Sequence, residues 1–492
     1  MGLYHSQPSA PGAPLRPDPL IERFVHTPGS ATPFSNPPPA RETGVPLKQF
    51  LSAVVLSSFA TCTALHAQDA APAPPARNLV APAAGHILVP LSSISRPEVA
   101  GVRMHTHHLI HVPAGHTDAR PGFTEAEFPP NAIQPVTGAV GETPASLACL
   151  YGQLKYTTGC NPTTLTTVAT GGSKAVAIVD AYDYPPATAD LTKFSKQFGL
   201  PAPITNSFSA TFTVIFASGK NPGPDPLCAD GNGTGCWGSE SSLDIEMVHS
   251  MAPKAHIYLV EADSSSNADL YAAVAKAIAL VKAAGGGEVS MSWGQPEYST
   301  EKSDDDTFVG AGAVFFASTG DSPGTEYPSV SPNVIAVGGT TISRNPITWA
   351  FQKEITWDQD GSGFSSIEPR PSFQNGIESA VGEWRGVPDV AAAANPYTPV
   401  WIYDSYQTNG SPWIQIGGTS EAAPLWAGIV NASGHFEASS DAELTTIYNN
   451  AKTASDFRDI GDGACGLTYG YLAVAGWDPC TGIGAPYGKS NQ

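Results

Sequence analysis

The sequence predicts an α/β fold, a doubly wound and mostly parallel sheet with helices on both faces. Short apolar, β-branched runs occur that are continuous rather than alternating, which is typical of strands buried on both faces. Segments with helical periodicity lie between these runs, and such alternation indicates parallel strands joined by helices. Ligands of these sheets bind beyond the carboxyl ends of the strands, so we expect functional residues there.

The individual elements follow from the same patterns. Strands are predicted at residues 175–182, 255–262, 288–294, 313–321 and 333–341, and helices at 187–199, 239–251 and 267–285. Asn267 is a plausible N-cap for the last helix, and Gly285 is a plausible stop. The glycines at 310 and 312 precede a strand instead of following one, which argues against a dinucleotide-binding loop.

Composition narrows the possible partners. Lys and Arg number 24 against 44 Asp and Glu, a formal net charge of -20, and the basic residues form no stripe or arm. Nucleic acid and anionic membranes are therefore poor partners, and we expect no stable membrane association. Charged residues make up only 14% of the chain while Gly (49) and Pro (46) are abundant, which favours a secreted, loop-rich protein.

The N-terminal region has the features of a processed segment. Residues 45–67 combine Lys48 with an apolar run and small residues before Gln68, which predicts a secretory signal peptide, or alternatively an uncleaved anchor. Residues 1–44 are Pro-rich and predicted to be disordered, and translation could begin near Val45. We interpret residues 68–135 as a linker or short pro-segment and residues 136–492 as the main folded domain. The histidine-rich run at 105–112 predicts a strand with polar edges, or alternatively a metal site.

Cysteine usage agrees with export. Six cysteines follow the predicted signal peptide, at 149, 160, 228, 236, 465 and 480. They could pair in about 15 ways, and we favour the local pairs 149/160, 228/236 and 465/480, each of which brackets a short loop. None has the spacing of a zinc finger, so disulfides in an oxidising compartment are favoured over metal.

Three segments carry candidate catalytic groups. Ser420 stands behind two glycines and a threonine in "IQIGGTSEAAPLWAG", ahead of a predicted helix, where it is either a nucleophile or a helix cap. None of the 12 histidines is followed by glycine, so the usual imidazole base is missing. Glu240 and Asp244 share a face of one helix, either as a proton-sharing pair or as a solvated surface. Asp321 follows a strand in a Gly-rich turn, where an Asx-turn is the alternative.

Read together and in order, "ESSLD", "STGDSPG" and "GGTSEAAP" resemble the sedolisin family, the serine-carboxyl peptidases. The likeness covers about residues 140–490 and includes "VSMSWG", "RGVPDVAAAANP" and "GWDPCTGIGAP". The resemblance implies a subtilisin-like fold for the doubly wound sheet. It also implies a serine-type peptidase in which Ser420 is the nucleophile and Glu240 its general base and then acid. Asp244 would orient Glu240 and share its proton, and Asp321 would donate a hydrogen bond in the oxyanion hole.

This chemistry implies action in acid. A carboxylate remains a competent base where an imidazole is already protonated. Asp321 can donate to an oxyanion only while it is protonated. Both conditions predict an acid optimum.

The resemblance also implies one calcium ion in the C-terminal loop. Its ligands would be the side chains of Asp459 and Asp478 with the carbonyls of Ile460, Val474 and Gly476. Val474 stands where the family usually has glycine. The alternative is an ordinary surface loop with two acidic residues.

The sequence therefore predicts a secreted, extracellular or periplasmic, monomeric endopeptidase that acts on protein or peptide substrates in acid. An exopeptidase of the same chemistry and an inactive binding domain on the same scaffold are alternatives. A two-carboxylate glycosidase is a third, but it gives no role to Ser420 or Asp321. The segment ahead of the catalytic domain is shorter than the usual pro-domain of the family, and Ser241 replaces a common aromatic residue after the glutamate.

Overall fold

The computed structural model describes residues 84–134, 139–157, 159–205, 209, 211–228, 236–406, 408–451 and 456–488. The chain divides into two compact units, Met1–Asp69 and Ala70–Gln492, and every described residue belongs to the second. The predicted signal peptide, its cleavage point and the Pro-rich extension lie outside the described residues.

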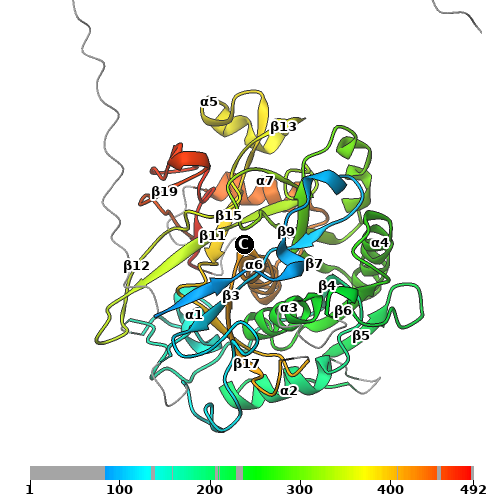
Figure 1. The fold of residues 1–492 in the computed structure, drawn as a ribbon. Coiled ribbons are helices and arrows are strands. Elements are labelled where there is room, and N and C mark those ends of the chain that lie inside the picture. The colour runs from blue at the N-terminus through cyan, green and yellow to red at the C-terminus, as the bar shows by residue number, and fades with distance from the viewer. Residues whose placement is uncertain are drawn as a thin grey trace, which may run out of the picture. The chain divides into compact units, whose positions relative to one another are not determined.

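The centre of the second unit is an eight-stranded sheet, which confirms the predicted fold class (Figure 1). Its strand order is β12-β11-β9-β7-β4-β6-β5, with β15 pairing to β11, and only the β11/β12 pair is antiparallel. The strands are β4 (Ala175–Ala181), β5 (Phe212–Phe216), β6 (His256–Ala262), β7 (Gly287–Met291), β9 (Ala313–Ser318), β11 (Ile335–Arg344), β12 (Phe351–Thr356) and β15 (Val390–Ala393). All five predicted strand regions are present, and the 288–294 region is divided between β7 and β8 (Trp293–Pro296).

Helices cover the two faces of this sheet. They are α1 (Pro144–Leu150), α2 (Ala187–Phe198), α3 (Trp237–Met251), α4 (Asn267–Ala283), α5 (Glu378–Val381), α6 (Thr419–Ser433) and α7 (Ser440–Asn450). In β4, Val176 and Ile178 join the apolar cluster that contains α3 and α6, whereas Val179 joins the cluster that contains α4. Burial on both faces explains why the strand runs are continuously apolar.

The predicted N-cap of α4 was wrong by one residue. Ser266 is the cap, because its backbone is extended and its hydroxyl accepts the N–H of Asp269, so Asn267 is the first helical residue. The predicted stop is confirmed by Gly285, whose φ of +87° favours glycine.

The histidine-rich run forms strands that pair with distant parts of the chain. β2 (His105–Thr106) pairs with β8, which in turn pairs with β10 (Glu326–Tyr327). β3 (Leu109–Pro113) lies between β1 (Gly85–Leu88) and β17 (Trp413–Gly417), in a sheet completed by β16 (Val400–Tyr403). The predicted strand is confirmed, and it is interrupted between residues 106 and 109.

Smaller elements and disulfides complete the unit. The remaining strands are β13 (Gly363–Pro369), β14 (Trp384–Val387), β18 (Phe457–Arg458), β19 (Ala464–Cys465), β20 (Tyr471–Leu472) and β21 (Ala485–Pro486). The predicted disulfides Cys149–Cys160 and Cys465–Cys480 are confirmed. Cys236 is also disulfide-bonded, and its pairing with Cys228 stays a prediction. In the described part of the chain, no helix has both the length and the apolar character needed to cross a membrane.

Candidate active site

The predicted catalytic residues gather where α3 and α6 pack together, beyond the carboxyl ends of β4, β7 and β9. All residues of α3 are buried, and Glu240 and Asp244 have exposures of 0%. The solvated-face alternative for this pair is therefore wrong. Two buried carboxyl groups one helical turn apart must share protons or be strongly destabilised.

Ser420 lies in the first turn of α6 and is fully buried. Its hydroxyl donates to the carbonyl of Ser292 at 3.3 Å and accepts the N–H of His107 at 3.2 Å. The N-cap is Gly418, and no side chain caps the helix there, so the capping alternative for Ser420 is wrong. Because a first-turn N–H has no partner within its own helix, the Ser420 N–H is free to bind another group.

Glu240 belongs to a coupled group of carboxyls. Burial raises its pKa well above the usual range, and the charges of Asp244, Asp180 and Asp321 raise it further, while the Ser420 hydroxyl lowers it. Burial likewise raises the pKa of Asp244, which accepts a hydrogen bond from Ser292 Oγ at 2.8 Å. Glu240 Oε1 and Asp244 Oδ2 have no hydrogen-bond partner among the described residues.

Asp180 belongs to the same group, and the sequence analysis missed it. It lies near the end of β4 with an exposure of 0%, and neither carboxyl oxygen has a partner in the described part of the chain. Burial raises its pKa to about 7. A single acidic residue inside the apolar run "AVAIVDAY" was the available signal.

Asp321 connects the loop after β9 to the start of α6. Its Oδ1 accepts the N–H of Thr419 at 2.8 Å and the Thr419 hydroxyl at 3.0 Å, so its role is not a local Asx-turn. Burial raises the pKa of Asp321 well above the usual range. Its Oδ2 is buried and lacks a partner among the described residues.

The N-terminal segment passes directly over Ser420. The Ser420 N–H donates to the carbonyl of His107 at 2.9 Å. On the amino side of this carbonyl, β2 pairs antiparallel with β8, with His105 opposite Gly294. On the carboxyl side, β3 pairs antiparallel with β17, with Leu109 opposite Gly417. The His107–His108 peptide bond thus lies between two strand pairings, as an added peptide strand would.

Gly418 makes this approach possible. A Cβ at that position would lie 2.2 Å from the His107 carbonyl oxygen and 2.6 Å from Asp321 Oδ2, and its φ of +115° also favours glycine. The free carboxyl oxygen of Asp321 and the His107 carbonyl therefore face the same small space. Beyond the bond, His108 Nδ1 lies 2.7 Å from Glu240 Oε2, and both side chains are fully buried.

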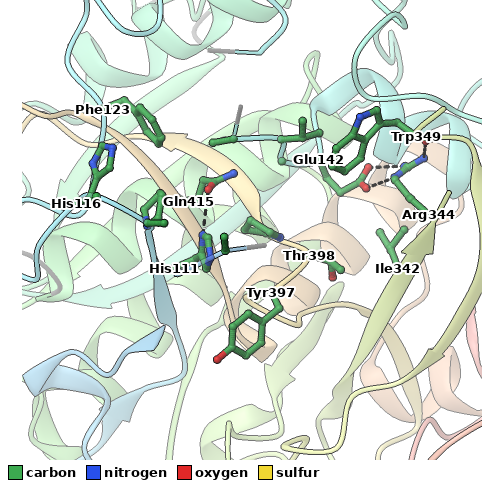
Figure 2. A pocket seen from close by; sticks show the side chains of 18 of the residues that line it. His111, His116, Phe123, Glu142, Ile342, Arg344, Trp349, Tyr397, Thr398 and Gln415 are labelled. Carbon is green, nitrogen blue, oxygen red and sulfur yellow. Dashed lines mark hydrogen bonds and ion pairs between the residues drawn. The ribbon is translucent and has the colours of Figure 1, made fainter. Parts of the chain in front are cut away.

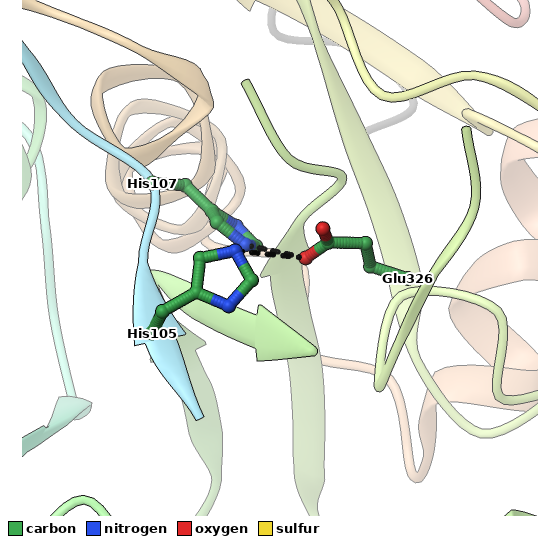
Figure 3. A group of neighbouring side chains, drawn as sticks. All are labelled: His105, His107 and Glu326. Atoms are coloured by element: carbon green, nitrogen blue, oxygen red, sulfur yellow. Dashed lines mark hydrogen bonds and ion pairs between the residues drawn. The ribbon is translucent and has the colours of Figure 1, made fainter. Parts of the chain in front are cut away.

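The preceding histidines meet a buried acid. His105, His107 and Glu326 place ligand-type atoms within 4.8 Å of one another (Figure 3). His107 Nε2 lies 2.8 Å and His105 Nε2 3.4 Å from the same oxygen, Glu326 Oε2. The sequence analysis considered a metal at these histidines but did not identify Glu326, which is more than two hundred residues away.

A cavity of about 470 Å³ lies beside β3 (Figure 2). His111 and Gln415 line it, with their Nδ1 and Oε1 atoms 3.1 Å apart, and Arg344 pairs with Glu142 at its edge. None of the predicted catalytic residues lines this cavity.

The C-terminal loop places the two predicted acidic ligands of calcium beside residues 474 and 476, which are predicted to supply carbonyl ligands. Asp459 accepts the N–H of Gly476 at 2.8 Å, and Asp478 Oδ2 accepts the N–H of Val474 at 3.0 Å. The Ile460 carbonyl lies 3.5 Å from the hydroxyl of Thr481, beside Asp478. An all-oxygen set of two carboxylates and three carbonyls suits a hard cation. Val474 does not have a positive φ, so its backbone accommodates a residue other than glycine.

A model of the Subtilase family matches residues 226–471, half of the chain. The chain belongs to the subtilase family. Kumamolisin of Bacillus sp. (strain MN-32) is 29% identical over 356 residues, 65% of this chain and 59% of that protein. Sedolisin of Pseudomonas sp. (strain 101) is 28% identical over 390 residues, 70% of this chain and 62% of that protein. These matches confirm the resemblance to the sedolisin family.

The chain spans about three fifths of the length of these two relatives. Tripeptidyl-peptidase 1 of Macaca fascicularis is 27% identical over 191 residues, 32% of this chain and 31% of that protein. Among solved structures, Pseudomonas sedolisin (serine-carboxyl proteinase) complexed with two molecules of pseudo-iodotyrostatin has a TM-score of 0.56 at 24% identity, covering 71% of this chain and 96% of that one. This likeness supports the subtilisin-like fold.

Proposed function

We propose that the protein is a serine-carboxyl peptidase that hydrolyses peptide bonds in acid through an acyl-enzyme on Ser420. The observation that carries this proposal is the His107–His108 peptide bond, which lies over Ser420 with its carbonyl on the Ser420 N–H. A peptide held by strand pairing on both sides of a reactive bond is arranged as a substrate.

Glu240 would remove the hydroxyl proton of Ser420 as its oxygen attacks the carbonyl carbon. The oxyanion would be held by the Ser420 N–H and by a protonated Asp321. Asp244 would hold the proton that Glu240 does not carry, because two buried carboxyls cannot both ionise. Glu240 would then return its proton to the departing amine, and water would release the acyl group from Ser420.

The segment that contains the His107–His108 bond would also keep the enzyme inactive until the segment is removed. The His108 side chain contacts the carboxyl group of Glu240, and the segment that contains β2 and β3 covers Ser420. While this segment is in place, other peptides cannot reach Ser420. This supports the interpretation of residues 68–135 as a short pro-segment. Because the bound chain continues on both sides of the bond, endopeptidase action is favoured over exopeptidase action.

We propose further that the enzyme is secreted, extracellular or periplasmic, and that it acts as a monomer on protein or peptide substrates. The confirmed disulfides suit an oxidising compartment. One calcium ion held by Asp459, Ile460, Val474, Gly476 and Asp478 would neutralise the two carboxylates and tie the C-terminal loop.

Digestion of denatured protein between about pH 3 and 5, where free imidazoles are protonated, tests the function. We expect the wild-type chain to be active and the Ser420→Ala variant to be inactive. Equal activity of the two would contradict the mechanism, and no activity in either would favour an inactive binding domain.

A further inference from the structure

His107 marks the position that precedes the reactive bond, here called P1. Its side chain is buried, with Nε2 2.8 Å from Glu326 Oε2 and Nδ1 2.6 Å from Ser318 Oγ. His105, two residues earlier at P3, points to the same side because side chains alternate along a strand (Figure 3). Its Nε2 lies 3.4 Å from the same Glu326 oxygen.

Glu326 differs from the other acids of the site. Burial would raise its pKa, but the charges and hydrogen bonds of His105 and His107 outweigh burial and lower the pKa below the usual range. Within the described part of the chain, the ion pairs of Glu326 are those with these two histidines. When the segment leaves, a buried carboxylate therefore loses its basic partners, and an incoming peptide with a basic side chain would restore them.

Two glycines leave space for the side chain at P1. A Cβ on Gly294 would lie 2.7 Å from His107 Cε1 and 3.0 Å from Glu326 Oε2. A Cβ on Gly320 would lie 3.4 Å from the Glu326 carboxyl carbon. Larger residues at these two positions would occupy the space through which the P1 side chain reaches Glu326.

We propose that Glu326 is a specificity-determining residue that selects peptides with a basic side chain (His, Lys or Arg) at P1 and favours a second one at P3. This inference rests on the proposed peptidase function. On this proposal, the His-Thr-His sequence at 105–107 is a preferred substrate sequence within the chain itself, and cleavage occurs between His107 and His108.

The alternative for this cluster is a bound metal ion. Both histidine nitrogens approach one carboxylate oxygen, at 2.8 and 3.4 Å, so N–H donors satisfy the carboxylate directly. An imidazole can donate such an N–H whether or not it is charged. If a metal ion joined these residues, a chelator would change the substrate preference. If the basic side chain contacts Glu326 directly, a chelator would leave the preference unchanged.

The test uses the full chain after incubation in acid, with pairs of fluorogenic peptides that differ only in His, Arg or Leu at P1. We expect wild type to prefer the basic peptides, and Glu326→Gln to reduce that preference about 10- to 100-fold, as expected for the loss of a charged hydrogen bond. Glu297→Gln is the control, because Glu297 binds the neighbouring Thr325 but neither histidine. It should keep the wild-type ratio. An unchanged ratio in Glu326→Gln, or a ratio that collapses with EDTA, would overturn the proposal.

A second arm leaves Glu326 intact in case its variant fails to fold. Full chains with His107→Arg and His107→Leu are followed by mass spectrometry for cleavage between residues 107 and 108. We expect the arginine variant to be processed at a rate near wild type and the leucine variant to be slower by about the same factor as above. Equal rates would refute the selectivity. Peptide cleavage without basic preference would refute only this inference, whereas unchanged cleavage by Ser420→Ala would refute the peptidase mechanism itself.

Discussion

Replacing Asp321 by asparagine should extend activity to higher pH, whereas most substitutions in a catalytic site only lower activity. Its Oδ1 accepts two hydrogen bonds from Thr419, and its buried Oδ2 faces the His107 carbonyl beside Gly418. Only the protonated carboxyl can donate from that oxygen. Burial raises the pKa of Asp321, so the donor is present below this raised pKa and is lost as the pH rises through it.

Asp321→Asn keeps the acceptor toward Thr419 and places an amide N–H₂ where Oδ2 lies. An amide donates at every pH, so we expect the alkaline limb of kcat/KM to move to higher pH while the acid limb, which belongs to the Glu240 and Asp244 pair, stays in place. Asp321→Ala removes the donor and should lower kcat by about 100- to 1,000-fold, or ~3–4 kcal/mol in the barrier.

Initial rates on one peptide across the acid to neutral range, for wild type and both variants, provide the measurement. Calorimetric melting of each variant separates a folding defect from a catalytic one. If Asp321→Asn showed the wild-type alkaline limb, or if Asp321→Ala retained full activity, Asp321 would have no part in holding the oxyanion.

Three further predictions concern latency and stability. His108→Leu removes the contact with Glu240, so processing of the full chain should be about tenfold faster on gels; an unchanged rate would show that His108 does not restrain the base. Chelation of calcium should lower the melting temperature, since an ion at 100 to 1,000 times its Kd contributes ~3–4 kcal/mol; the same melting curve with and without EDTA would argue against the ion at Asp459 and Asp478. Replacing Cys465 and Cys480 together by serine opens a link of sequence separation 15 and should cost ~3 kcal/mol in urea unfolding; an unchanged midpoint would contradict this.

Much of the fold was predictable because its signals are local. Strands β4 and β9 are buried on both faces, so each appears as a nearly continuous apolar run. The division of residues 288–294 between β7 and β8 was not predictable, since it depends on β8 turning to pair with β10 and β2.

The candidate site was predictable only in part. Glu240, Asp244, Asp321 and Ser420 stand in motifs that can be recognised within a few residues. The contacts of His107 with Ser420 and of His108 with Glu240 join groups more than one hundred residues apart and have no local signal. The burial of every face of α3 has no local signal either. Glu326 was missed because an acidic residue in sequence looks the same whether it is solvated or buried. Asp180 did have a local signal, its position inside the apolar run of β4, and the sequence analysis did not use it.

The central claim is that a carboxyl group, rather than an imidazole, activates Ser420. The most direct test is the single-turnover rate at which Ser420 is acylated near pH 4, where free imidazoles are protonated, in wild type and in Glu240→Gln. Glutamine keeps the shape of the side chain but cannot take a proton. We predict that acylation slows by about 1,000-fold or more, within the range for loss of a general base. Acylation of both proteins at the same rate would contradict the claim.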